Sequence, residues 1–273
     1  MPIFVRNLNL EFLTENGVLK SDLMLGMYEK SRWRQAHGAY YLTYTMASGV
    51  EFIFKTMRDG EDLRVVGTDT HLAGRCYWNA IPFMNVTPKE SDDLSALVAF
   101  TNLAQDGVFL AHLMNAAVLP AIEEGQSIAM QMAAFPHAVA LYESREDYER
   151  AASVTPPDGG QPIILSDRRV FPLNFILKHD PDVQEDQRDH SLREEVLLIC
   201  GPVIDVQKRS HAEPDDSGAS FIVATITTQF GPLDVAFTQD MVESKECKVG
   251  AYLVFSGVLS GNVAIEGHEN WLD

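Results

Sequence analysis

The chain has few cysteines and a shortage of basic side chains. Its 273 residues include three cysteines, Cys76, Cys200 and Cys247, which are far apart and form no C-x-x-C pair. This scattered, odd-numbered set argues against a disulfide framework and indicates a reducing compartment. The 21 Lys and Arg side chains face 39 Asp and Glu, which gives a net charge of −18. Such a charge repels nucleic-acid phosphates and anionic membranes, and it suits basic partners.

Targeting segments and long apolar runs are also lacking. The first residues, Met1–Arg6, contain no basic region followed by an apolar stretch, so no signal peptide is expected. No apolar stretch approaches the roughly 20 residues that a membrane-spanning helix needs. The sequence therefore predicts a soluble, cytoplasmic protein. Because 46% of the residues are hydrophobic, the chain can bury a full core.

The motifs of the best-marked enzyme families are absent as well. The sequence has no H-E-x-x-H, no G-x-x-x-x-G-K-[ST], no G-x-S-x-G and no G-x-G-x-x-G after a strand. These absences remove the nucleotide-binding and hydrolase families with the clearest signatures, and no cofactor is expected. They leave catalysis by less recognisable residues open.

Short β-like runs separated by turn signals are what the chain has in abundance. A hairpin is expected over Tyr40–Met57, around Ala47-Ser48-Gly49, and a second turn at Arg58-Asp59-Gly60. Ser144 is placed to cap a helix that ends near Ala152. We predict a mainly β fold, either all-β or α+β. Residues 1–152 are expected to form a β-barrel or sandwich with a short helix at each end.

The C-terminal segment, residues 189–273, holds five β-like runs and a short polar stretch between the third and the fourth. The runs are Val196–Gln207, Phe221–Phe230, Leu233–Thr238, Ala251–Gly257 and Asn262–Glu266. This layout resembles a five-stranded OB-fold barrel, and we expect the segment to fold alone. OB-folds often bind single-stranded nucleic acid or oligosaccharides. Here 5 basic face 14 acidic side chains, which disfavours nucleic acid.

Residues 153–188 are rich in proline, glycine and carboxylates and are expected to be a linker. From His179 to His190 the chain carries two histidines and five carboxylates. Since oxygen-rich segments bind hard cations, weak candidate metal ligands are His179, Asp180, Asp182 and His190. The EF-hand spacing is absent, so a solvated acidic loop is the favoured interpretation.

The stretch Gly67–Arg75 is predicted to be a polar loop between two β-like runs, and it holds the candidate catalytic residues Asp69, His71 and Arg75. An Asp can orient a His that acts as a general base, and an Arg can hold an anionic group. If the segment is extended, Asp69 and His71 point to the same face. The favoured alternative is a hairpin loop in which Asp69 caps a turn and Arg75 pairs with a carboxylate.

Two stretches of the chain match weakly in pattern and in length to within two residues. One runs from Gly125 to Glu143, and the other from Gly250 to Glu266. Duplication of a barrel unit would produce this match, but any two pairs of consecutive strands of this size would also match. The sequence leaves both explanations open.

These features favour a non-enzymatic binding protein whose acidic surface binds a protein partner, as an adaptor, an inhibitor or an assembly subunit. One alternative is an enzyme for a small anionic or carbohydrate substrate with a site around Asp69, His71 and Arg75. Another is oligosaccharide binding by the OB-fold-like barrel. Neither nucleic acid nor membrane is expected as a partner, and a homo-oligomer is compatible with the sequence.

Overall fold

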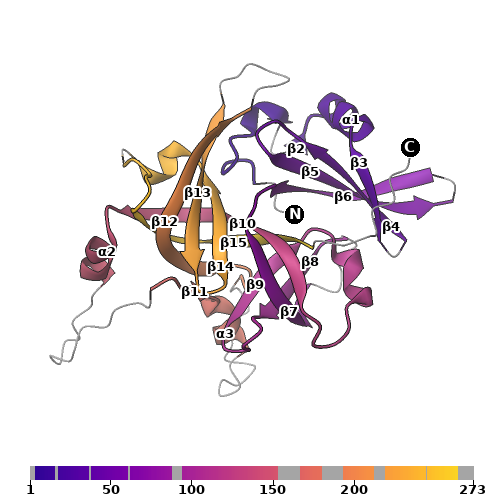
Figure 1. The fold of residues 1–273 in the computed structure, drawn as a ribbon. Helices are drawn as coiled ribbons and strands as arrows, with labels where there is room; N and C mark the ends of the chain where they lie inside the picture. The colour runs from indigo at the N-terminus through magenta and orange to yellow at the C-terminus, as the bar shows by residue number, and fades with distance from the viewer. Residues whose placement is uncertain are drawn as a thin grey trace.

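The computed structural model describes residues 4–15, 18–36, 38–60, 62–87, 94–152, 167–179, 193–211, 219–243 and 245–263. Within these residues the protein is mainly β, so the predicted fold class is confirmed (Figure 1). The described helices are α1 (Ser21–Glu29), α2 (Arg145–Ala152) and α3 (Leu173–Lys178). None of them is long and apolar enough to cross a membrane.

A four-stranded antiparallel sheet forms one layer, in the order β3-β4-β5-β6. Its strands are β3 (Arg32–Ala36), β4 (Ala39–Thr45), β5 (Val50–Asp59) and β6 (Asp62–Leu72). The predicted hairpin is confirmed, because Tyr40 pairs with Thr56 across a turn in which Gly49 has a φ of 83°. A two-stranded ribbon, β1 (Thr14–Glu15) with β2 (Val18–Leu19), precedes α1.

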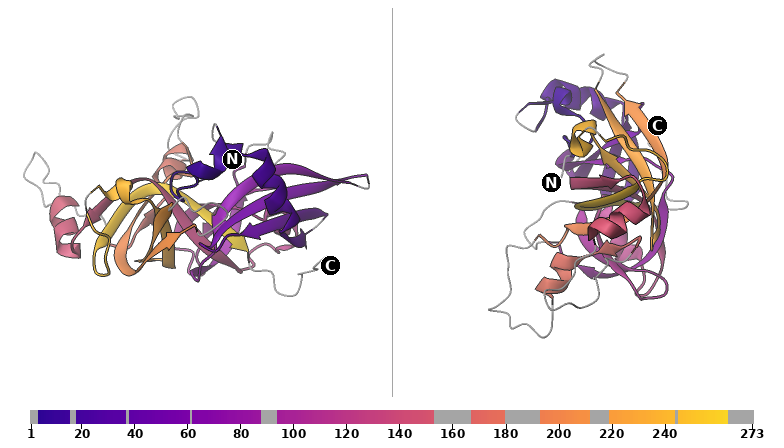
Figure 2. Two further views of the ribbon diagram at one scale, coloured as in Figure 1. Left: turned by 90° about the horizontal axis from the view of Figure 1, so that it is seen from above. Right: turned by 90° about the vertical axis from the view of Figure 1, so that its left-hand side faces the viewer.

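The larger sheet has nine strands in the order β11-β12-β13-β14-β10-β15-β9-β8-β7, with additional pairings of β12 with β15 and of β10 with β7. The strands are β7 (Tyr77–Asn85), β8 (Ala96–Thr101), β9 (Val108–Leu113), β10 (Ile128–Tyr142), β11 (Val170–Phe171), β12 (Leu197–Ser210), β13 (Ser220–Thr228), β14 (Gly231–Phe237) and β15 (Tyr252–Val263). Seen from above, the four-stranded sheet extends at one end of the molecule and α2 lies at the other (Figure 2).

The pairings trace two closed circuits of five strands that share β10 and β15. One circuit runs β12-β13-β14-β10-β15 and returns to β12, and the other runs β7-β8-β9-β15-β10 and returns to β7. In each circuit the third strand lies parallel to a shared strand: β14 to β10, and β9 to β15. Each third strand also leads to the next shared strand through a 3-10 helix, η2 (Ala116–Ala121) or η4 (Gln239–Val242). The two circuits therefore have the same strand order and directions, as a duplication would produce.

The prediction of a break between the two final runs is wrong, because β15 continues through residues 258–261 into Asn262 and Val263. The rest of the second predicted run, residues 264–266, lies outside the described residues. Gly257, at the end of the first predicted run, is a site of close contact. A Cβ on Gly257 would lie 2.5 Å from the carbonyl oxygen of Phe135 on β10. The strand that completes the C-terminal circuit is β10, from residues 128–142. The sheet thus continues across the expected linker, and the domain boundaries proposed from the sequence remain predictions.

Part of that expected linker is ordered against the sheet. Val170 of β11 pairs with Ile199 of β12, so the apolar stretch after residue 169 contains an edge strand. Side chains from both circuits share one core, including Trp78, Phe109, Phe237 and Phe255. Burying each such side chain contributes about 1.5–3 kcal/mol to folding.

A second core lies between the four-stranded sheet and the outer faces of β10, β13, β14 and β15. The N-terminal segment takes part, because the ring of Phe4 stacks on Phe135 with 3.7 Å between centroids. Phe52 and Phe54 of β5 are fully buried in the same cluster as Phe221 of β13. This apolar layer holds the two sheets together around the polar residues considered next.

Candidate functional site

Two of the predicted catalytic residues lie on a strand and not on a loop, since β6 extends to Leu72. The loop prediction for residues 67–72 is therefore wrong. Asp69 and His71 are two residues apart and lie on the same face of β6, as expected for an extended segment. Neither side chain is exposed. Asp69 forms an ion pair with Lys55 of the neighbouring strand, with 2.7 Å between Oδ2 and Nζ. The third residue, Arg75, lies beyond the strand and is exposed.

Both ring nitrogens of His71 are used in hydrogen bonds to the shared strands. Nδ1 lies 2.7 Å from the hydroxyl of Ser260 on β15, and Nε2 contacts Oε1 of Gln131 on β10. Burial lowers the pKa of His71, while the nearby Glu51 acts in the opposite direction. A general base needs a free nitrogen within reach of a substrate, and here both nitrogens are occupied inside the protein. The arrangement favours a structural role for His71.

The buried polar side chains of Lys55, Asp69, His71, Gln131 and Ser260 form a polar seam between the two sheets. The seam continues from Gln131 towards β14. Gly74 lies so close to Asp234 that a Cβ on it would be 2.2 Å from Oδ2 of that carboxylate. The other oxygen of Asp234 accepts a hydrogen bond of 2.7 Å from Thr225. Burial, together with Asp234, raises the pKa of the Cys76 thiol, so this cysteine is protonated and unreactive at neutral pH.

Sequence reasoning missed the partners in this seam, Lys55, Gln131, Asp234 and Ser260, because they come from four different strands. The only local signal is a polar residue at an inward position of an apolar strand. Lys55 shows it most clearly, since it follows Phe52-Ile53-Phe54 and is completely buried. A lysine is almost never fully buried without a partner, so its position implied a buried carboxylate.

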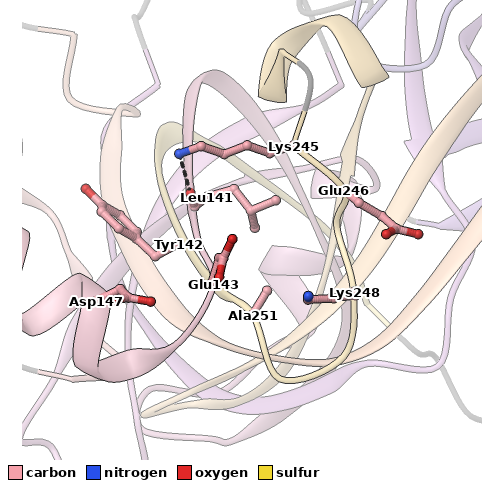
Figure 3. A pocket seen from close by; sticks show the side chains of 8 residues that line it. All are labelled: Leu141, Tyr142, Glu143, Asp147, Lys245, Glu246, Lys248 and Ala251. Carbon is pink, nitrogen blue, oxygen red and sulfur yellow. Dashed lines mark hydrogen bonds between the residues drawn. The ribbon is translucent and has the colours of Figure 1, made fainter.

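A pocket of about 640 Å³ opens near α2, at the end of the molecule away from the four-stranded sheet (Figure 2 and Figure 3). It lies where β10 ends, where α2 begins and where the chain enters β15. Leu141 and Ala251 are nearly completely buried beneath it. The remaining lining side chains are polar: Tyr142, Glu143, Asp147, Lys245, Glu246 and Lys248.

The charged groups of this pocket have both signs. Lys245 Nζ donates to the carbonyl oxygen of Leu141 at 2.8 Å and lies 5.9 Å from the ring centroid of Tyr142. Asp147 accepts a hydrogen bond from Ser144, and it pairs with Arg150 at 3.0 Å. Such a lining suits a charged segment better than an apolar small molecule, because ligand pockets for the latter are mostly hydrophobic.

Of the weak candidate metal ligands, only His179 lies in the described part of the chain. Its Nε2 is 2.9 Å from a carboxylate oxygen of Glu194, whose other oxygen pairs with Lys178 at 2.5 Å. Asp180, Asp182 and His190 lie outside the described residues. Within the described ranges, no group of three or more His, Cys, Asp or Glu side chains is placed to hold a metal ion.

No protein-family model, no curated protein and no solved structure matches this chain. Its function therefore has to be inferred from its own residues.

Proposed function

We propose that the protein is a cytoplasmic, non-enzymatic binding protein that uses acidic segments to bind a basic protein partner, as an adaptor, an inhibitor or an assembly subunit. The distribution of charge carries this proposal. Residues 180–192 hold five carboxylates and one arginine, and residues 212–218 hold three carboxylates and no basic side chain. Negative charge is thus concentrated in short stretches of the sequence, most strongly in residues 180–192. Concentrated charge of one sign steers and selects a partner of the opposite sign.

The described body itself is nearly balanced, with 23 acidic and 19 basic side chains. Several of these charges are paired: Arg145 with Glu149 and Asp167, for example, at 2.7 and 2.9 Å. This near balance, beside acidic stretches elsewhere in the sequence, is compatible with a recognition role for those stretches. The three cysteines, all buried, are compatible with the cytoplasmic location proposed here.

The enzyme alternative draws less support. Asp69 forms an ion pair with Lys55, and the two ring nitrogens of His71 contact Ser260 and Gln131. Neither Asp69 nor His71 has any exposed surface. A substrate would have to displace these contacts before either group could react.

Oligosaccharide binding by the C-terminal circuit is also less favoured. OB-folds bind ligands on the outer face of their second and third strands, which correspond to β13 and β14. Here Phe221, Val223 and Ala236 of those strands pack beneath the N-terminal segment and the four-stranded sheet. The protein's own chain thus occupies that face.

The test is affinity capture from the native host, followed by binding measurements with the captured protein. One variant neutralises the carboxylates of residues 180–192: Asp180→Asn, Asp182→Asn, Glu185→Gln, Asp186→Asn and Asp189→Asn. A matched control neutralises the same number of exposed carboxylates on the body: Glu11→Gln, Glu15→Gln, Glu29→Gln, Glu123→Gln and Glu124→Gln. We expect a basic partner whose affinity falls with salt, is lost in the first variant and survives in the control. Equal binding by both variants, or binding that ignores salt, contradicts the proposal.

A further inference from the structure

Two buried histidines connect the four-stranded sheet to the nine-stranded sheet with the same pattern of hydrogen bonds. His71 projects from β6 onto β10 and β15. His211 directly follows β12 and contacts Ser48, in the turn between β4 and β5, and Leu8 in the N-terminal segment. In both rings Nδ1 meets a serine hydroxyl and Nε2 meets a carbonyl oxygen.

These contacts fix which tautomer the neutral His71 ring adopts. Gln131 donates its amide nitrogen to the carbonyl oxygen of Met132 at 3.1 Å, so its Oε1 faces the ring as an acceptor. Nε2 of His71 must then carry a proton, and in the neutral ring Nδ1 accepts from the hydroxyl of Ser260, 2.7 Å away. Protonation would turn Nδ1 into a donor and require the Ser260 hydroxyl to reverse its role.

The same reasoning applies to His211. The carbonyl oxygen of Leu8 lies 2.7 Å from Nε2 and can only accept, so Nε2 carries a proton, and in the neutral ring Nδ1 accepts from the Ser48 hydroxyl at 3.0 Å. The ring is 3% exposed and lies between the aromatic rings of Phe12 and Phe221, with centroids 5.5 and 5.4 Å away. These apolar surroundings disfavour a charge on the ring.

The charges around His71 compensate a proton only in part. His71 faces Glu51 and shares its sheet face with the ion pair of Lys55 and Asp69, whose charges largely cancel. His112, opposite Ser260 on β9, is another neutral ring, because burial lowers its pKa.

The charged group that contacts the Ser48 turn has the wrong sign for stabilising a protonated His211. The guanidinium of Arg209 donates to the carbonyl oxygens of Ser48 and Ala73, at 3.3 Å each. Burial lowers the pKa of His211 as well as that of His71. Protonation would place a poorly compensated cation at each of the two connections, which is costly in a buried site.

We propose that this pair of serine–histidine contacts is a pH-sensitive latch, closed when both rings are neutral and loosened when acidification protonates them. Loosening releases β6 and the turn at Ser48 from β10, β12 and β15. The apolar cluster beneath the sheet, including Phe135 and Val223, then becomes accessible in a local opening. This inference is independent of the proposed binding function, since it depends only on contacts within the described sheets.

Hydrogen exchange of the full-length protein, corrected for the intrinsic effect of pH, tests the latch. We compare about pH 7.5 with about pH 5, on either side of the ordinary histidine pKa. In β6 and residues 46–50 we expect exchange to be about tenfold faster at the lower pH for each histidine that is protonated. The turn between β13 and β14, residues 226–233, contains no titratable side chain; it is the internal control and should change little. Uniform acceleration, or none, overturns the proposal.

Variants separate the latch from general acid sensitivity. His71→Gln and His211→Gln keep a donor and an acceptor but cannot take up a proton, so the double variant should lose the pH-dependent difference. His137→Gln, at an exposed position of β10, is the control and should retain it. If the double variant does not fold, nitrogen NMR of the wild-type imidazoles gives the answer. Both rings should show the Nε2–H tautomer at neutral pH and titrate together with the local opening. Rings that remain neutral while exchange accelerates contradict the latch.

Discussion

Lys55 and Asp69 form an ion pair 2.7 Å long in which neither side chain has any exposed surface. They come from adjacent antiparallel strands, and Oδ2 of Asp69 makes the contact. The other oxygen, Oδ1, has no hydrogen-bond partner among the residues that the structure describes. The carboxylate therefore depends on the lysine for much of its compensation within this layer.

Removing the lysine should be far more harmful than removing both charges. Lys55→Met leaves a buried carboxylate without its cation, and we expect it to lower the free energy of unfolding by about 3–5 kcal/mol. The double variant Lys55→Met with Asp69→Leu should recover most of that loss. Urea denaturation measures both. As a control, Arg6→Met breaks the exposed pair with Asp240 and should cost less than about 1 kcal/mol. Equal losses in the single and double variants would show that the pair is not coupled.

The free energy of unfolding should fall as the pH drops below about 6.5, the ordinary pKa of histidine. Burial lowers the folded-state pKa of His71, His112 and His211. Below pH 6.5 these histidines therefore bind protons in the unfolded chain more readily than in the folded chain. Their contribution to stability is fully present above the unfolded-state pKa and is lost as the pH falls below it. Urea denaturation at several pH values gives the slope. A free energy that is flat from neutral pH down to about pH 5 would contradict these lowered pKa values.

Because β10 pairs with both β14 and β15, we predict that residues 189–273 do not fold alone. That fragment lacks the strand that pairs with both β14 and β15, so it would expose two unpaired edges. We expect it to give a poorly dispersed amide NMR spectrum, and to gain dispersion when residues 1–152 are added. A well-dispersed spectrum of the isolated fragment would mean that β15 alone satisfies the circuit.

Two glycines should respond to alanine in opposite ways. At Gly257 a methyl group would meet the backbone of Phe135 and Pro136 at 2.5 and 2.8 Å, so Gly257→Ala should cost about 1–3 kcal/mol of stability. Gly26 lies in α1 with no atom within 4 Å of an added Cβ, and there alanine should stabilise the protein by about 0.5–1 kcal/mol. Thermal unfolding of the two variants tests the contrast, which fails if both shift the midpoint in the same direction.

The three cysteines should react slowly with a thiol reagent while the protein is folded. All are buried, burial raises the pKa of Cys247 to about 11, and the pKa of Cys76 is raised further by Asp234. Thiolate, the reactive form, is therefore scarce at Cys76 and Cys247 at neutral pH, and burial shields Cys200 from the reagent. We expect all three to react quickly once the chain is unfolded in guanidinium. Rapid labelling of one cysteine in the folded state would identify a local opening at that position.

Local sequence signals predicted the elements that depend on near neighbours. Ser144 does cap α2, with its hydroxyl 3.1 Å from the amide nitrogen of Asp147. The hairpin around Gly49 and the mainly β character are likewise local properties. The parallel pairing of Ala133 with Asp234 was not predictable, because it joins residues 101 positions apart and leaves no trace in either strand.

The candidate site shows the same limit. Alternation correctly placed Asp69 and His71 on one face, but whether that face is solvated depends on the strands packed over it. Gln131 and Ser260, which occupy the two ring nitrogens of His71, come from strands far along the chain. A polar pair between two β-like runs gives the same sequence pattern whether it borders a cleft or lies beneath another sheet.

The shared strands impose an order on biosynthesis. A growing chain emerges N-terminus first, so β7 to β10 are available long before β15 exists. Without β15, β9 has no parallel partner and neither circuit is closed. The nascent chain then exposes an apolar, unpaired edge of β10 until β15 has been synthesised. Such edges promote aggregation. A chaperone that covers residues 128–142 until β15 is synthesised would therefore raise the yield of folded protein.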